Sequence, residues 1–140
     1  MPCIFHVSGK TFQPELALNS ATFKPYKIYT IGEKINFGRP GAVYSDSGFS
    51  VYIGPEDNWD LTEQIEAAQM FVQDYFSVLK LLRDAESLRF DYGYKPRRGD
   101  DDLTMLCQCD SFDPAFLKMC GELNIAIELS LYGIETDVDS

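Results

Sequence analysis

The chain has 140 residues and a formal net charge of −10, because 22 acidic residues outnumber 12 lysines and arginines. Its hydrophobic share of 45% is typical of a globular domain and argues against an intrinsically disordered chain. The negative charge opposes binding to nucleic acid and to anionic membrane surfaces, and it would attract a basic partner. Acidity that only keeps a small protein soluble explains the charge as well.

Alternating apolar residues predict three strands in the first part of the chain, at residues 3–8, 26–31 and 49–53. In the first of these strands Cys3 and His6 are expected to point to opposite faces. Between the second and third strands lies a stretch rich in glycine, residues 37–48, which lacks the Lys-Ser/Thr ending of a phosphate-binding loop. We interpret this stretch as a connecting loop.

The strongest predicted element is a long amphipathic helix over residues 61–84. Asp60 is a good N-cap residue, and Glu63 follows three positions later, as in a capping box. Apolar residues then recur at alternating steps of four and three, which indicates one buried face. The stripe consists of Leu61, Ile65, Ala68, Val72, Tyr75, Leu79 and Leu82. Further apolar residues widen the stripe, so we expect the helix to pack across a sheet.

Three more strands are predicted after this helix, at residues 88–94, 104–109 and 125–131, and a helix at residues 114–123. In the last strand, Ile125, Ile127, Leu129 and Leu131 are expected to face inward, and the last helix is expected to bury Phe116, Leu117, Cys120 and Leu123. The fold class is therefore α+β: one domain at residues 1–134, with a largely antiparallel sheet of about six strands, one long helix and two shorter helices. An acidic tail follows at residues 135–140.

One short motif occurs twice, as TFQPELAL at residues 11–18 and as SFDPAFLK at residues 111–118. Proline is suited to the first helical position, which makes Gln13 and Asp113 the caps of two helices. Asp113 is a strong cap and Gln13 a weak one, so the first helix is expected to be the shorter and looser. The repeat is explained equally well by two duplicated half-domains and by chance recurrence of a strand–turn–helix pattern.

The order of several segments resembles the bacterial family called domain of unknown function 4279. The segments are SGKTFQPELA, YTIGEK, SDSGFSVYI, the long amphipathic helix and SFDPAFLKMCGELNIAIELSLYG, which together cover most of the chain. The resemblance implies a non-enzymatic α+β domain of a kind suspected to act as an immunity partner of bacterial toxins. It brings no catalytic residues with it.

Few residues could support catalysis or hold a metal. His6 is the only histidine and lies in a predicted strand, which favours a structural role. Cys107, Cys109 and Cys120 could meet in space with His6, but their spacing lacks a C-x-x-C pair, so we interpret the cysteines as core residues rather than zinc ligands. No catalytic residue, metal ligand or cofactor is predicted.

The favoured hypothesis is a non-catalytic acidic binding protein, an immunity- or inhibitor-type protein that caps a basic partner such as a toxin. The candidate partner-binding residues are Asp100, Asp101, Asp102, Glu63 and Glu66. One alternative is a small-ligand-binding or self-associating domain with Tyr26, Tyr29, Tyr52 and Tyr92 as contact surface. A less favoured alternative is an enzyme that uses His6 or the cysteines.

The sequence shows neither a signal-peptide pattern nor an apolar run of the roughly 20 residues that span a bilayer. We therefore expect a cytoplasmic protein without membrane or nucleic-acid partners.

Overall fold

The computed structural model describes residues 2–19, 23–36, 38–97 and 107–133. The elements in chain order are β1 (Cys3–Gly9), α1 (Pro14–Leu18), β2 (Lys27–Tyr29), β3 (Ser47–Ile53), α2 (Leu61–Leu82), β4 (Ser87–Tyr94), α3 (Pro114–Glu122) and β5 (Ile125–Leu131). The predicted acidic tail, and the candidate residues Asp100, Asp101 and Asp102, lie outside the described residues.

The strands form one sheet in the order β2-β3-β1-β4-β5. Every neighbouring pair is antiparallel except β4 and β5, which run parallel. The predicted α+β class is therefore confirmed, with five described strands in place of about six. The missing one is the strand predicted at 104–109, of which only residues 107–109 are described, and these are not in a strand. There, the Gln108 side chain and the Cys109 carbonyl bind Arg97 instead.

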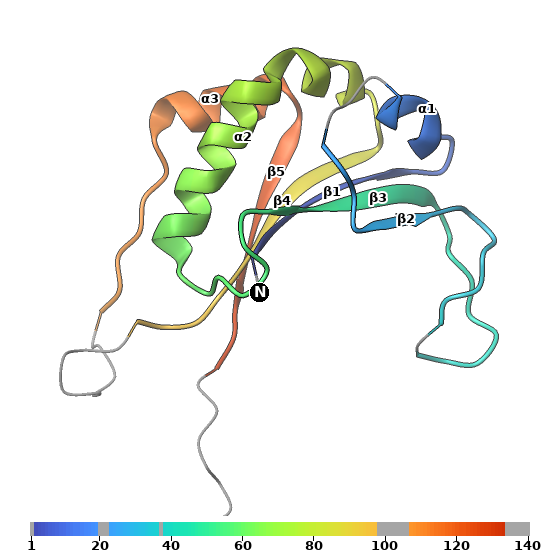
Figure 1. Cartoon of the computed structure of the whole chain (residues 1–140), viewed down its shortest axis with the longest axis horizontal. Helices are drawn as coiled ribbons and strands as arrows, with labels where there is room; N and C mark the ends of the chain where they lie inside the picture. Colours follow the sequence, from blue (N-terminus) through green and yellow to red (C-terminus); the bar gives the residue numbers. More distant parts are fainter. Residues whose placement is uncertain (1, 20–22, 37, 98–106, 134–140) are drawn as a thin grey trace, which may run out of the picture.

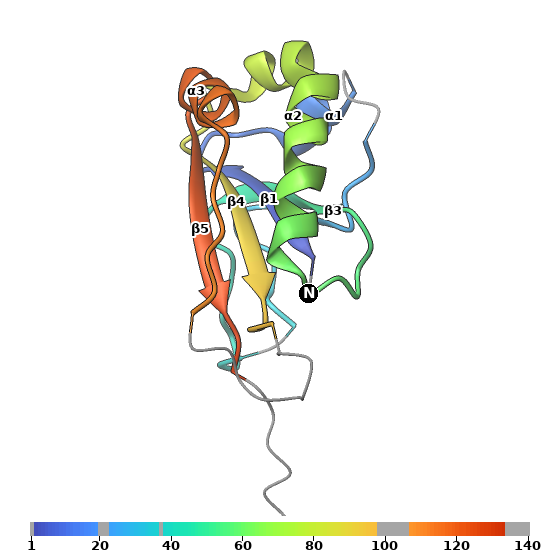
Figure 2. The ribbon, with the colours of Figure 1, turned by 90° about the vertical axis from the view of Figure 1, so that its left-hand side faces the viewer.

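The three helices lie on one side of the sheet (Figure 1). Helix α2 packs against β1, β3 and β4, and α3 packs against β5 and α2. The view turned by 90° shows α2 standing in front of the strands (Figure 2). The core fills the space between the helices and the sheet, where Phe5 is fully buried with its ring centroid 5.5 Å from that of Phe71 and 5.2 Å from that of Phe90. The opposite face of the sheet is covered by no helix of the described chain, although Ile4 and Ser50 on it are buried, at 4% and 3% exposed (Figure 1).

Helix α2 begins as predicted, because the Asp60 side chain accepts a hydrogen bond from the Thr62 amide at 3.1 Å. The second half of the expected capping box is replaced: the Asp60 amide donates to the Asn58 side chain at 3.0 Å rather than to Glu63. Six of the seven predicted stripe residues are buried, and Tyr75 is half-buried. The backbone at Tyr75 leaves helical geometry, with φ −113° and ψ 17°, so the helix has a kink there.

The two copies of the repeated motif both start a helix at proline, as predicted. Gln13 makes no capping hydrogen bond with its side chain, whereas Asp113 accepts one from the Ala115 amide at 3.2 Å. Helix α1 has five residues and α3 has nine, which confirms that the first helix is the shorter. The settings differ, however, since β1 precedes the first copy and no strand is formed at 107–113 before the second. Within the described residues the two copies share the helix start and the strand that follows it, β2 or β5, but not a strand before it.

Three residues predicted to be buried near the end of the chain are exposed. Leu117 is 45% exposed, Leu129 51% and Leu131 61%. Leu117 lies on α3, which buries Phe116 and Cys120 instead. The exposure of Leu129 and Leu131 follows from position, because β5 is an edge strand and α3 turns directly into the start of it through Asn124, whose φ of 59° is left-handed. Helix α3 therefore covers the beginning of β5, where Ile125 is 6% exposed, and leaves the second half uncovered.

Candidate functional site

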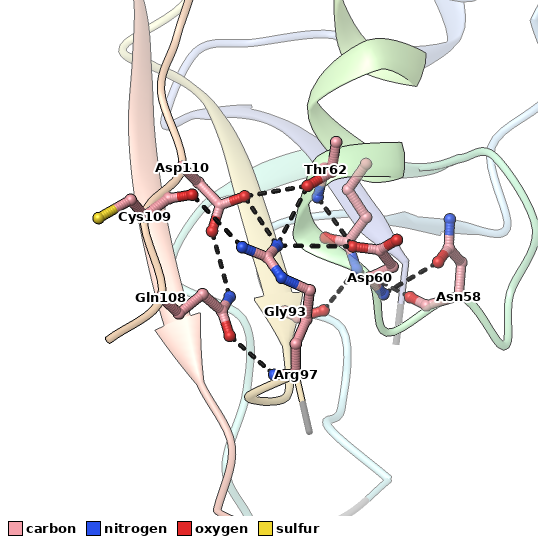
Figure 3. A network of polar contacts seen from close by, with 9 residues as sticks. Asn58, Asp60, Thr62, Gly93, Arg97, Gln108, Cys109 and Asp110 are labelled. Atoms are coloured by element: carbon pink, nitrogen blue, oxygen red, sulfur yellow. Dashed lines mark hydrogen bonds and ion pairs between the residues drawn. The ribbon is translucent and has the colours of Figure 1, made fainter. Parts of the chain in front are cut away.

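A network of polar contacts centred on Arg97 joins three separate segments at one end of the sheet (Figure 3). Arg97 follows β4, and its Nη1 donates to Asp110 at 3.0 Å and to Thr62, at the start of α2, at 3.1 Å. Its Nη2 donates to the Cys109 carbonyl at 3.3 Å, and its backbone N–H donates to Gln108 at 2.7 Å. The network therefore fixes the segment before α3 against α2. The sequence analysis assigns no role to Arg97, because its partners lie on segments distant in the sequence.

Asp110 is the anionic centre of this Arg97 network. Its Oδ1 accepts hydrogen bonds from Arg97 and from the Thr62 hydroxyl at 3.0 Å, and its Oδ2 accepts one from Gln108 at 3.1 Å. Burial alone would raise the pKa of Asp110, but the hydrogen bonds from these three residues outweigh burial and hold the pKa below its ordinary value. Asp110 therefore carries its negative charge at neutral pH in a fixed position.

Gln64 supports the network from inside the protein. The side chain is fully buried, and its Nε2 donates to the carbonyl oxygens of Asn58 at 2.8 Å and Gly93 at 2.7 Å. The two bonds join the loop before α2 to the end of β4. A sequence signal existed for this residue, because Gln64 lies three positions after Leu61, within the apolar stripe of the helix.

An open groove of about 390 Å³ lies between α2 and the segment that precedes α3. Three carboxylate residues line it, namely Glu66, Asp110 and Asp113. The predicted partner-binding residues Glu63 and Glu66 are both exposed on the first half of α2, and only Glu66 lines the groove. Neither forms an ion pair with any residue that the structure describes. We call Glu66, Asp110 and Asp113 the acidic groove.

His6 and Ser50 meet on the face of the sheet opposite the helices. His6 Nδ1 lies 2.7 Å from Ser50 Oγ, and the Tyr26 hydroxyl also bonds to Ser50. A serine beside a histidine is a familiar catalytic pair, but Ser50 is only 3% exposed, and its hydroxyl is held by two neighbours. The geometry therefore favours the structural role predicted for His6. The sequence prediction missed this contact, which joins residues on different strands.

The imidazole of His6 should make folding sensitive to acid. Burial, with help from the nearby Arg89, lowers the pKa of His6 to about 4; Asp91 opposes this shift and Lys27 adds to it. An unfolded histidine has a pKa near 6.5, so the folded state binds its proton less readily. The stability that neutral His6 contributes is thus present above about pH 6.5 and is lost as the pH falls towards 4.

Between pH 7 and pH 4, the His6→Gln variant should lose about 1 to 2 kcal/mol less free energy of unfolding than the wild-type protein. This figure allows for solvent screening of a half-buried ring. Urea unfolding of both proteins at pH 7 and pH 4 measures the difference. Parallel pH profiles of the two proteins would contradict the assignment.

The four tyrosines predicted to form one contact surface do not share a face. Tyr26 stacks on Tyr52 with ring centroids 3.9 Å apart, and Tyr29 stacks on Tyr44 at 4.6 Å. These pairs lie on β2, β3 and the flanking loop. Tyr92 is instead fully buried in the core beneath the helices, so its inclusion was wrong. Alternation along β4 places Tyr92 beside Phe90, on the covered side of the sheet.

The cysteines divide into two kinds. Cys3 and Cys120 are buried in the core, as predicted, and burial raises the pKa of both thiols, to about 12 for Cys120. Cys107 and Cys109 are exposed, so the core interpretation was wrong for them. Their sulfur atoms lie 3.4 Å apart. Within the described residues, no group of three or more His, Cys, Asp or Glu side chains is placed to hold a metal ion.

A second open groove, of about 850 Å³, lies between α1 and the edge strand β2. Three of its lining residues are large exposed apolar side chains: Leu16 at 63%, Ile28 at 47% and Ile31 at 48%. The groove therefore offers an apolar surface beside a strand edge with one free side.

Comparison with known proteins adds no identification: no family model matches the chain, and neither a curated protein nor a solved structure matches it. None of the described helices is long and apolar enough to cross a membrane.

Proposed function

We propose that this chain is a non-catalytic acidic binding protein that caps a basic protein partner, in the manner of an immunity or inhibitor protein. The observation that carries the proposal is the acidic groove, where Glu66, Asp110 and Asp113 line one hollow. The net charge of −10 and the resemblance to the domain of unknown function 4279 family support the same class.

The acidic groove is suited to receive a lysine or arginine side chain of the partner. Asp110 is held by its ion pair with Arg97, and Asp113 caps α3, so these two residues shape the groove. Glu66 is exposed and has no ion pair among the described residues, so it is the carboxylate best placed to pair with a cationic side chain of the partner. The surrounding negative charge steers a basic partner towards the groove and raises the rate of association.

The partner should be identified first, by affinity capture from native lysate and mass spectrometry. Recovery of one basic protein in a stoichiometric complex is the expected result. If the purified chain instead carries a bound metabolite, or forms a dimer, the second candidate function below is favoured.

Charge reversal at Glu63 and Glu66 should slow association with that captured partner by about ten-fold at low salt, with little change in the dissociation rate. The effect should shrink as salt rises, because screening weakens long-range steering. Stopped-flow mixing at two salt concentrations measures both rates. Reversal of Asp100, Asp101 and Asp102 extends the test to the part of the chain outside the described residues.

A matched control is reversal of Asp74 and Asp84, which are exposed on the second half of α2 and just beyond its end and change the net charge by the same amount. These substitutions should slow association much less. An equal effect of the two double variants would show that only net charge matters. If the association rate changes neither with the substitutions nor with salt, the electrostatic proposal is wrong.

The second candidate function is binding of a small apolar ligand, or self-association, at the α1–β2 groove. Its exposed Leu16, Ile28 and Ile31 favour this candidate, because clustered apolar side chains mark contact sites. This candidate does not depend on charge, so a salt-insensitive complex would favour it over the first.

A further inference from the structure

Cys107 and Cys109 form a pair of exposed thiols, and Cys109 also lines the acidic groove of the proposed binding function. Their sulfur atoms are 3.4 Å apart, and a disulfide needs about 2.05 Å, so closure requires the two atoms to approach by about 1.4 Å. Side-chain rotation and small backbone adjustments supply movements of that size. The two thiols are thus already placed for reaction with one another.

We propose that Cys107 and Cys109 form a reversible dithiol–disulfide site that exchanges with small disulfides of the glutathione type. In the first step, one cysteine thiolate attacks a sulfur of the small disulfide, forms a mixed disulfide and releases one small thiolate. In the second step, the other cysteine thiolate attacks the protein sulfur of the mixed disulfide and releases the second small thiolate. Two protein thiols are oxidised and one small disulfide is reduced to two thiols.

The neighbouring contacts favour ring closure over a lasting mixed disulfide. The Gln108 side chain accepts from the Arg97 backbone N–H at 2.7 Å, and the Cys109 carbonyl accepts from the Arg97 guanidinium at 3.3 Å. These bonds hold Gln108 and Cys109 against Arg97, which follows β4. A held pair reacts at high effective concentration, so the second step is fast.

The other two cysteines provide an internal comparison. Cys3 is fully buried and Cys120 is 3% exposed, so neither can be reached by a small disulfide in the folded protein. Burial also keeps both thiols protonated, and only the thiolate attacks. The exchange reaction should therefore be confined to Cys107 and Cys109.

The test is to incubate the folded, reduced protein with oxidised glutathione and to measure intact mass and peptide masses. The expected product has lost two hydrogens, and both missing hydrogens map to the peptide that contains Cys107 and Cys109. Cys107→Ser and Cys109→Ser should each accumulate a stable glutathione adduct on the remaining exposed thiol. Reduced glutathione should reverse all three products.

Alkylation with iodoacetamide completes the test without further variants. In the reduced, folded protein Cys107 and Cys109 should be labelled, and Cys3 and Cys120 only after denaturation. Three results would each overturn the proposal: two glutathione adducts on the wild-type chain without ring closure, no reaction at either exposed thiol, or equal labelling of all four cysteines in the folded state.

Discussion

Gln64→Glu should lower the free energy of unfolding by about 3 to 5 kcal/mol at pH 7, because it leaves a buried charge without compensation. The present amide group donates to the carbonyl oxygens of Asn58 and Gly93 from a fully buried position. A carboxylate of the same shape has no hydrogen to donate and faces two acceptors. The loss is measured by urea unfolding followed by circular dichroism.

The pH dependence of this variant separates charge from shape. The buried, introduced carboxyl group has a raised pKa in the folded state, so its penalty grows as the pH rises through that value and shrinks towards about pH 4. Gln64→Leu removes the hydrogen bonds without adding a charge, and it should cost about 2 kcal/mol at every pH. Gln73→Glu, on the exposed side of α2, is the matched control and should change stability by less than about 0.5 kcal/mol. Equal stability of the two glutamate variants would contradict the role of Gln64.

Gly48→Ala should destabilise the protein by about 3 kcal/mol, since a methyl group there overlaps its neighbours. A Cβ at this position would lie 2.3 Å from the carbonyl oxygen of Val7 and 2.6 Å from the hydroxyl of Tyr29. Gly48 pairs with Ser8 on one side and Tyr29 on the other, so the backbone cannot move away without breaking the sheet. Thermal unfolding measures the loss.

Gly121→Ala is the matched control for this substitution. Gly121 lies in α3, and a Cβ there meets no atom within 4 Å. Alanine is a better helix former than glycine, so this variant should gain up to about 1 kcal/mol. If Gly48→Ala and Gly121→Ala change the stability equally, the close approach of β1 to β3 does not require glycine at position 48.

The sequence predicts the fold well where the signal is local. The stripe of α2 and the alternation of β5 predict both elements to within two residues, because the periodicity records which side of one element is apolar. The exposure of Leu129 and Leu131 could not be predicted in this way. It depends on how far α3 reaches over an edge strand, which no pattern inside β5 records.

The candidate site was harder to predict, because its contacts join distant residues. His6 meets Ser50, and Arg97 meets both Thr62 and Asp110, across separations that carry no periodic signal. Glu66 was predicted from charge alone, and the structure adds two carboxylates beside it. Gln64 could have been found, since a polar residue within an apolar stripe requires a buried partner.

The position of β1 between β3 and β4 has a consequence for synthesis of the chain. β1 leaves the ribosome before both of its neighbours, so its two edges stay unpaired until Ser47–Ile53 and then Ser87–Tyr94 have followed. Pairing over such separations is slow, because the entropy of closing a long loop must be overcome first. A nascent chain that stops before Ser87 can pair only β2, β3 and β1, and the second edge of β1 stays open until β4 arrives.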